Sequence, residues 1–371
     1  MAFLKRVSIK GYRSLKDVDL ELGSLNVLIG ANGAGKSNFI SFFKMLNEMM
    51  AGRLQQYVAA SGRARSILYL GPKVTPQLEA TLEFEKDNGL DTYRMRLFHA
   101  ANDSLVFADE MLDYRKPDWH GAPPPPMSLG AGHQESRIGD YAAQGNGTAK
   151  VFRHILNDCR VYHFNDTSST ARVRQHGYIG DNRWLMPDAG NLAALLYAYR
   201  RQSEPVYQRI VATLKKIMPD FADFDLEPDR LNPKEIALDW RKAGTDYLFG
   251  PHQISDGTLR AMAIVTLFLQ PENDLPDVII LDEPELGLHP YGLQIIAGLM
   301  RAAAVKSQVI VATQSQAFLE HFDPAEIVVV ETREGSSHLR RLDARQLTDW
   351  LDDYSIGELW EKNVIGAGPL P

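Results

Sequence analysis

One short stretch of the chain has the residue types and the spacing of a loop that binds phosphate groups. It matches the pattern G-x-x-x-x-G-K-[ST], and its residues are Gly30, Ala31, Asn32, Gly33, Ala34, Gly35, Lys36 and Ser37. The glycines let backbone N–H groups point at phosphate oxygens, the Lys36 ammonium reaches the β- and γ-phosphates, and the Ser37 hydroxyl is a ligand for Mg²⁺. We therefore expect this phosphate loop and the following Asn38 to bind ATP and Mg²⁺. The alternative is a glycine-rich turn that binds nothing.

A second set of reactive side chains follows an apolar run much later in the chain. Val278 to Leu281 is typical of a buried strand, and Asp282 and Glu283 follow it directly. Carboxylates at the C-terminal ends of strands in an open α/β sheet lie where ligands bind. We expect Asp282 to hold Mg²⁺ opposite Ser37, and Glu283 to orient and deprotonate the water that attacks ATP. Without the phosphate loop, a strand-end turn at Pro284 would explain the two acids equally well.

A parallel sheet and a helix must position these side chains. Leu25 to Ile29 predicts a buried strand that enters the phosphate loop, and Ser37 to Met50 predicts the helix that leaves it. The other predicted strands are Phe3–Ile9, Leu78–Glu85, Tyr93–Phe98, Val278–Leu281, Val309–Thr313 and Ile327–Glu331, with a helix at Gly292–Ala304. Apolar strands separated by helices indicate a parallel sheet covered on both faces. In Leu78–Glu85 and Tyr93–Phe98, apolar and polar residues alternate, which indicates antiparallel strands. The predicted fold class is therefore α/β, a P-loop NTPase with a parallel core sheet and an antiparallel side sheet.

The sequence predicts three parts. Residues 1–86 form a lobe with the phosphate loop, residues 87–240 form an insert, and residues 241–371 form a lobe with the two acids. Within the insert, residues 121–148 are rich in Pro, Gly, Ser and Gln and predict a mobile loop. We expect the rest of the insert to be largely helical. Its predicted helices are Leu192–Arg200 and Pro205–Met218.

The composition excludes several classes of protein. The 40 basic and 47 acidic residues give a net charge of −7, which weighs against a dedicated nucleic-acid binder but leaves room for a local basic groove. The single cysteine, Cys159, excludes an internal disulfide framework and fits a reducing cytoplasm. No apolar run approaches the ~20 residues of a membrane-spanning helix, and the N-terminus lacks the apolar region of a signal peptide. We therefore expect a cytoplasmic protein without membrane contact.

Three motifs resemble those of ABC-type ATPase heads. Asp282–Pro290, which reads DEPELGLHP, resembles the Walker B motif and D-loop, and Ile254–Arg260, which reads ISDGTLR, resembles the signature motif. Ile9–Ser14 is similar to the first strand of RecF and SMC heads. The chain resembles AAA-family ATPases of the ABC/SMC/RecF-like type, above all the heads of the OLD (overcoming lysogenization defect) family. The similarity covers roughly residues 1–85 and 240–371.

The resemblance implies a head-to-tail homodimer with ATP between the phosphate loop of one copy and the signature motif of the other. The signature residues here are Ser255, Asp256 and Gly257. Independently of the resemblance, Ser255 is a suitable N-cap for a helix that starts near Thr258, which places a second anion site at that helix terminus. Gly257 would let the backbone approach a phosphate closely. Simple helix capping is the alternative role for Ser255.

The chain also departs from the family pattern. Gln314 stands where related heads often carry a histidine that contacts the γ-phosphate, and an amide cannot take a proton at neutral pH. We assign Gln314 and Glu283 as the catalytic residues and expect slow or partner-dependent hydrolysis. OLD proteins carry a TOPRIM nuclease domain after the head, but Asp352 and Asp353 are too few acids for one, so we expect no nuclease here. Gln77 is the candidate for a further Mg²⁺ contact, and an exposed loop glutamine is an equally good interpretation.

Two classes of function remain open. The first is an ATPase that serves DNA repair and maintenance or anti-phage defence, with a separately encoded effector protein and duplex DNA as candidate partners. The second is a nucleotide-gated scaffold that regulates a partner toxin or nuclease with negligible hydrolysis. Glu283 favours the first class, because a pure sensor needs no base beside Mg²⁺. A transporter subunit is a weaker third interpretation, since the signature motif resembles the RecF and OLD group more closely.

Overall fold

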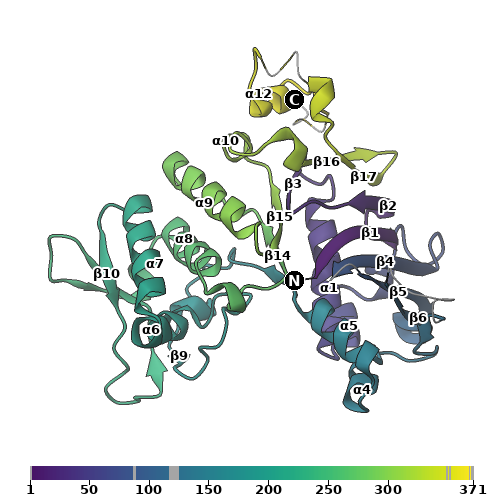
Figure 1. The fold of residues 1–371 in the computed structure, drawn as a ribbon, viewed down its shortest axis with the longest axis horizontal. Coiled ribbons are helices and arrows are strands. Elements are labelled where there is room, and N and C mark those ends of the chain that lie inside the picture. Colours follow the sequence, from purple (N-terminus) through teal and green to yellow (C-terminus); the bar gives the residue numbers. More distant parts are fainter. Residues whose placement is uncertain are drawn as a thin grey trace.

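The core sheet runs through the middle of the molecule, between an antiparallel sheet with its helices and a mainly helical part (Figure 1). The antiparallel sheet with α1, α4 and α5 lies on one side of β14 and β15, and the helical part with α6, α7 and α8 lies on the other. The computed structural model describes residues 2–86, 89–116, 125–347, 350, 352–366 and 368.

The core sheet has six strands in the order β17-β16-β3-β15-β14-β8. All neighbours from β16 to β8 are parallel, and β17 is an antiparallel edge strand. Every residue of β3, which reads LNVLI, is buried, as expected for a strand covered on both faces. The strands are β3 (Leu25–Ile29), β8 (Cys159–Tyr162), β14 (Val278–Asp282), β15 (Gln308–Thr313), β16 (Ile327–Arg333) and β17 (Ser336–Arg341).

The second sheet is antiparallel throughout, in the order β2-β1-β4-β5-β6-β7. In β4, buried residues alternate with more exposed ones, because this sheet covers the core with one face. Its strands are β1 (Phe3–Tyr12), β2 (Leu15–Glu21), β4 (Gln77–Lys86), β5 (Gly89–Ala100), β6 (Ser104–Arg115) and β7 (Met127–Ser128).

The helix after the phosphate loop, α1 (Lys36–Met50), packs between the two sheets. Its Phe39 and Phe43 rings meet edge to face, with centroids 5.4 Å apart, in a hydrophobic core that includes Leu28 of β3 and Leu82 of β4. Burial of each such side chain stabilises the fold by about 1.5–3 kcal/mol. This packing fixes α1, and with it the loop that precedes it, relative to the core sheet.

A second hydrophobic core covers the opposite face of the core sheet. Val27 and Ile29 of β3 and Leu281 of β14 point into this core, which the helical part completes. The helices are α6 (Leu192–Gln202), α7 (Glu204–Ile217), α8 (Asp256–Phe268) and α9 (Pro290–Ala303). Two small antiparallel sheets adjoin them, β10 (Phe221–Asp225) with β12 (Asp239–Lys242) and β13 (Leu248–Phe249), and β9 (Gly177–Tyr178) with β11 (Glu235–Ile236).

Short helices complete the described chain, and none of the described helices is long and apolar enough to cross a membrane. They are α2 (Leu54–Ala60), α3 (Ala64–Ile67), α4 (Ile138–Ala143), α5 (Gly147–Asn157), α10 (Gln316–Leu319) and α12 (Ile356–Glu361). The 3-10 helices are Ala101–Asp103, Arg172–Arg174, Pro251–Gln253, Glu272–Asp274, Pro324–Glu326 and Ala344–Leu347.

The region expected to be a helical insert, residues 87–240, differs from that expectation. The expected boundary at residue 87 falls between β4 and β5, which pair with each other. The antiparallel sheet therefore continues into this region with β5 and β6. β8 joins the core sheet beside β14. The two predicted helices, Leu192–Arg200 and Pro205–Met218, correspond to α6 and α7. The alternating run Tyr93–Phe98 did predict a strand, which lies within β5, but the expected boundary at residue 87 separated it from β4, with which it pairs.

The expected mobile loop at 121–148 is also different where the structure describes it. Residues 125–148 contain β7, α4 and the first turn of α5, while residues 121–124 lie outside the described part. Leu129, Ile138 and Ala142 are buried in the core between the two sheets. These apolar side chains order a segment whose proline and glycine content suggested a loop.

Candidate active site

The phosphate loop leaves the middle of the core sheet, because β3 lies between β15 and β16. Gly33 and Gly35 have φ angles of +79° and +114°, which side chains strongly disfavour. A Cβ atom at Gly35 would also lie 2.0 Å from the Ser337 hydroxyl oxygen. The turn therefore requires glycine at both positions, as its spacing in the motif suggested.

The Lys36 side chain is folded back over the loop. It is 4% exposed, and its Nζ donates hydrogen bonds to the carbonyl oxygens of Gly30 at 2.6 Å and Ala31 at 3.1 Å. Burial lowers the pKa of Lys36, and three nearby carboxylates oppose that shift, namely Glu283, Asp282 and Glu285. The phosphate loop and the acidic end of β14 thus meet, although they are far apart in the sequence.

The loop is braced from outside by two serines. Ser14 follows β1 and Ser337 lies on β17, and the Ser337 hydroxyl oxygen is 2.6 Å from the Ala34 carbonyl oxygen and 2.7 Å from the Ser14 hydroxyl oxygen. Asn38 Nδ2 donates a hydrogen bond to the Ser14 hydroxyl at 2.6 Å. Asn38, predicted to contact the nucleotide, therefore uses its side-chain amide in this brace.

Asp282 ends β14 beside the Ser37 hydroxyl. Burial raises the pKa of Asp282, and a hydrogen bond with Ser37 opposes this shift. Asp282 Oδ1 is buried and has no hydrogen-bond partner among the described residues. A carboxylate and a hydroxyl are the hard oxygen donors that Mg²⁺ prefers, so this pair fits the cation. The described part of the chain offers no group of three or more His, Cys, Asp or Glu side chains that could hold a metal, so nucleotide and water oxygens would have to complete its coordination.

The two residues predicted to be catalytic, Glu283 and Gln314, are in direct contact. Gln314 follows β15, the neighbour of β14, and its Nε2 donates a hydrogen bond to Glu283 Oε1. Glu283 has a φ of +47°, and its N–H donates to the Ala312 carbonyl oxygen at 2.8 Å. This conformation costs of order 1–3 kcal/mol and persists only where neighbours enforce it, which is common at active sites.

Glu285 is a residue of this site to which the sequence analysis gave no role. It is 6% exposed, and its Oε1 accepts hydrogen bonds from Thr313 Oγ1 and, at 3.4 Å, from the Gln314 N–H. Its Oε2 is buried without a hydrogen-bond partner among the described residues. Burial raises the pKa of Glu285 to about 7, and the charge of Glu283 adds to the rise. The available signal was a further acid in a segment that was already marked by Asp282 and Glu283.

The signature loop, residues Ile254–Arg260, begins α8. Ser255 is the N-cap as predicted, because its hydroxyl oxygen accepts a hydrogen bond from the Thr258 N–H at 3.3 Å. Asp256 Oδ1 lies 2.7 Å from Arg174 Nη2. The side chains of Ser255 and Asp256 are exposed. The loop therefore presents the start of a 13-residue helix to the surface.

Gly257 has a close neighbour within its own chain, besides the phosphate predicted to approach it. A Cβ atom there would lie 2.0 Å from the carbonyl oxygen of Gly287, which follows the acidic end of β14 and has a φ of +77°. The close approach of these two backbones within one chain is enough to require a glycine. Gly257 thus joins the signature loop to the segment after Glu283.

Gln77, the further candidate for Mg²⁺, is the first residue of β4 in the antiparallel sheet. Its Nε2 donates a hydrogen bond to Glu79 Oε1 at 2.6 Å, so its described contacts give the metal role no support. The end of β8 reaches Asp282 instead. Asn165 Nδ2 donates to the Asp282 carbonyl oxygen at 3.4 Å. Burial and the charge of Lys44 lower the pKa of His163, and Asp282 opposes this shift.

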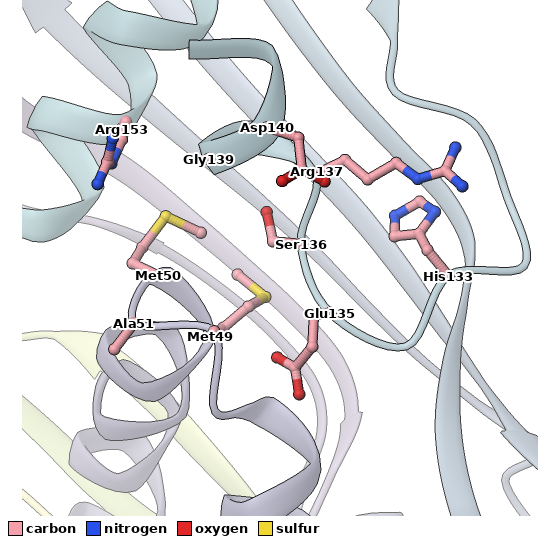
Figure 2. A pocket seen from close by; sticks show the side chains of 11 residues that line it. Met49, Met50, Ala51, His133, Glu135, Ser136, Arg137, Gly139, Asp140 and Arg153 are labelled. Carbon is pink, nitrogen blue, oxygen red and sulfur yellow. The ribbon is translucent and has the colours of Figure 1, made fainter. Parts of the chain in front are cut away.

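A pocket of about 420 Å³ lies elsewhere, at the end of α1 away from the phosphate loop (Figure 2). Its walls come from the end of α1, the segment before α4, the start of α4, and α5. Glu135 in this wall accepts hydrogen bonds from the N–H groups of Leu54 and Gln55, so its carboxylate is used by the first turn of α2. None of the predicted nucleotide-site residues lines this pocket. The lining residues are Met49, Met50, Ala51, Gly52, His133, Glu135, Ser136, Arg137, Gly139, Asp140 and Arg153.

Two segments of the chain match family models. Residues 3–99, with the phosphate loop, match the model described as "AAA ATPase domain". Residues 172–320, with the signature loop and the acidic end of β14, match the model described as "AAA domain, putative AbiEii toxin, Type IV TA system". A stretch of 37 residues is 49% identical to an OLD nuclease from Thermus scotoductus, and it covers 10% of this chain and 7% of that nuclease.

Solved structures with a similar fold are SMC head domains. A head bound to the C-winged helix domain of ScpA has a TM-score of 0.64 and 16% identity, over 94% of this chain and 99% of that one. A head with an extended coiled coil, bound to the C-terminal domain of ScpA derived from Pyrococcus furiosus, has a TM-score of 0.59 and 16% identity, over 95% and 99% of the two chains. The predicted fold class is therefore confirmed.

Proposed function

We propose that this ABC/SMC-like AAA-family ATPase, which is related to OLD, binds ATP with Mg²⁺ and hydrolyses it between two copies arranged head to tail. The observation that carries the proposal is the meeting of Lys36 with Asp282 and Glu283 at one edge of the core sheet. A phosphate group would neutralise the buried ammonium, and a divalent cation would neutralise the neighbouring carboxylates, which lack enough hydrogen-bond partners.

Each residue at this edge has a defined task in the proposal. Lys36 exchanges its bonds to loop carbonyls for bonds to the β- and γ-phosphates. Ser37 and Asp282 hold Mg²⁺, which when bound neutralises charge on the phosphates. Glu283 orients the attacking water and takes its proton, while the Gln314 amide fixes the orientation of the Glu283 carboxylate.

The second copy supplies the other half of the site. The exposed Ser255 hydroxyl and the first N–H groups of α8 form an anion site with the positive end of the helix dipole. This site is therefore suited to bind the γ-phosphate of an ATP molecule held by the phosphate loop of a partner.

Hydrolysis by this site is expected to be slow unless a partner assists. Gln314 holds Glu283 through a hydrogen bond but cannot accept a proton at neutral pH. A separately encoded effector and duplex DNA are the partners that we propose, in DNA repair and maintenance or in anti-phage defence. Support comes from the likeness to an OLD nuclease and from the SMC heads, which are bound to domains of ScpA in the structures named above.

The contact between Glu283 and Gln314 also favours a second function. An amide that occupies Glu283 Oε1 leaves one carboxylate oxygen for water, so turnover in the chain alone could be negligible. The protein would then be a scaffold that changes shape when it binds nucleotide and regulates a toxin or nuclease.

A variant that binds ATP without cleaving it tests the paired arrangement. Glu283→Gln keeps the side-chain shape and removes the base, so we expect sedimentation to show a dimer with Mg-ATP and a monomer without it. Lys36→Ala is the control, since it lacks the phosphate contact and should stay monomeric in both conditions. A Glu283→Gln protein that remains monomeric at saturating ATP would rule out the two-copy site.

A further inference from the structure

Arg174 is a buried arginine that holds the signature loop. It is 5% exposed and lies in the 3-10 helix Arg172–Arg174. Its guanidinium donates hydrogen bonds to the carbonyl oxygens of Pro251 and Ile254, the latter at 3.0 Å, and to Asp256 Oδ1 at 2.7 Å. Three acceptors within the signature loop or just before it are therefore bound by one side chain.

The same guanidinium is anchored in the segment that follows β8. Its Nε donates to the Thr167 carbonyl oxygen at 2.8 Å. We call this segment, residues 163–174, the β8 loop. It also contacts the acidic end of β14, because Asn165 Nδ2 donates a hydrogen bond to the Asp282 carbonyl oxygen at 3.4 Å. The β8 loop thus contacts the acidic end of β14 at one end and the signature loop at the other.

A second arginine closes the connection. Arg260, in α8, donates from Nε to the Phe164 carbonyl oxygen at 3.2 Å and from Nη1 to the Leu286 carbonyl oxygen. Together with the backbone contact between Gly257 and Gly287, this places the start of α8 against the segment after Glu283. The signature loop is consequently held from two sides, by the β8 loop and by Leu286–Gly287.

The carbonyl contacts matter more than the ion pair. The Asp256 side chain is 66% exposed, and an ion pair that water screens contributes little. The Pro251 and Ile254 carbonyl oxygens are reached by a donor that is buried, where hydrogen bonds of a charged group are stronger and loss of the donor leaves acceptors unsatisfied. A planar guanidinium serves several acceptors in fixed directions, which a lysine ammonium cannot reproduce.

We propose that Arg174 is a positioning residue that sets the orientation in which the signature loop is presented to the second copy. It acts through the Pro251 and Ile254 carbonyl oxygens and touches no nucleotide. This inference rests on the proposed function, since only a two-copy site uses the signature loop of another chain.

The experiment mixes variants that damage opposite halves of the site. Arg174→Ala keeps an intact phosphate loop, and Lys36→Ala keeps an intact signature loop. We expect Arg174→Ala alone to lose at least about tenfold in turnover, while its affinity for ATP as a monomer changes less than about twofold. Mixed one to one with Lys36→Ala, it should recover turnover well above the level of either variant alone, because the mixed dimer has one intact site, which holds ATP between the phosphate loop of Arg174→Ala and the signature loop of Lys36→Ala.

Three controls separate the explanations. Arg172→Ala changes an exposed neighbour in the same turn, paired with Asp188 at 3.1 Å, and should leave turnover unchanged. Ser255→Arg blocks the signature loop directly and should recover on mixing with Lys36→Ala in the same way. Arg174→Lys replaces Arg174→Ala in the mixture if the alanine variant does not fold, and the same recovery is expected from it.

The outcomes point in different directions. Undiminished turnover in Arg174→Ala overturns the inference. It is also overturned if Ser255→Arg recovers on mixing and the folded Arg174 variant does not, because Arg174 then acts in its own site or only in stability. If neither Ser255→Arg nor the Arg174 variant recovers, the two-copy site itself fails. Recovery of both supports the positioning role.

Discussion

The two halves of the proposed site are built in opposite ways. Where the phosphate loop meets the acidic end of β14, Lys36 and Glu285 are 4% and 6% exposed, and the reactive side chains lie at the start of α1 or at the ends of β14 and β15. At the signature loop, Ser255 and Asp256 are exposed, and the groups offered to a ligand are a hydroxyl and backbone N–H groups. One half concentrates charge that can do chemistry, and the other presents a helix terminus to the surface.

This difference explains why a single chain has an incomplete site. Buried carboxylates and ammonium groups cost free energy unless they are paired, so their enclosure must supply partners, which here include loop carbonyl oxygens for Lys36 and the Thr313 hydroxyl for Glu285. A helix terminus needs no such enclosure and can remain exposed until a phosphate arrives. The Gly257–Gly287 contact and the guanidinium of Arg174 connect the two halves within one chain.

The largest expected effect comes from a methyl group placed where the halves meet. In Gly257→Ala the new Cβ would lie 2.0 Å from the Gly287 carbonyl oxygen, which is backbone and cannot turn aside. The signature loop must shift, and we expect turnover to fall at least about a hundredfold, which corresponds to ~2.7 kcal/mol. Affinity of the isolated chain for ATP should be retained, because the phosphate loop is not touched.

A matched control exists in α9. A Cβ at Gly298, which is exposed, would meet nothing within 4 Å, so Gly298→Ala should leave turnover unchanged and stabilise the helix by about 0.5–1 kcal/mol. Steady-state turnover and equilibrium ATP binding of both variants check this prediction. If Gly257→Ala turned over like wild type, the two halves would not depend on that contact.

The next effect is a dependence of stability on pH that belongs to the buried half. The pKa of Glu285 is raised from its ordinary value of 4.5 to about 7, mainly by burial. Between these values the folded chain binds more protons than the unfolded chain, so stability falls as pH rises from 4.5 through 7. We expect a loss of about 1–3 kcal/mol between pH 5 and pH 8 from this group.

Glu285→Gln should remove that part of the pH dependence. Unfolding in urea at pH 5 and pH 8, without nucleotide, measures it, and Glu361→Gln in α12 is the control at an exposed glutamate. The free energy of unfolding of Glu285→Gln should change less between pH 5 and pH 8 than that of the wild type, whereas Glu361→Gln should behave like the wild type. Equal pH dependence in wild type and Glu285→Gln would show that the carboxyl is ionised in the folded chain throughout this range.

Local patterns predicted those parts of the fold and site that are contiguous in sequence. The phosphate loop and the strand before Asp282 are short runs in which residue type and spacing express the function directly, and β3 has the predicted bounds. The N-cap role of Ser255 is likewise local, since its hydroxyl bonds to a residue three positions on. Such features depend on neighbours in the chain and can be recognised in it.

The remaining features depend on distant partners. β8 has four residues, too few for a periodic pattern, yet it brings Asn165 to Asp282. Arg174 binds Asp256, which is 82 positions away, and the reason for the glycine at position 257 is the backbone of Gly287. Tertiary pairing decided these cases. The metal role of Gln77 stays a prediction, since its amide bonds to Glu79 in the same strand.

The central feature of the proposed function is that catalysis needs both halves of the site, each from a different copy. The most direct measurement is steady-state ATP turnover per chain against protein concentration, for wild type beside Glu283→Gln, with and without duplex DNA. We predict that wild-type turnover per chain rises with concentration to a plateau and is absent in Glu283→Gln, and a further rise with DNA would support the proposed partner. Turnover per chain that is independent of concentration down to the lowest measurable level would contradict the claim.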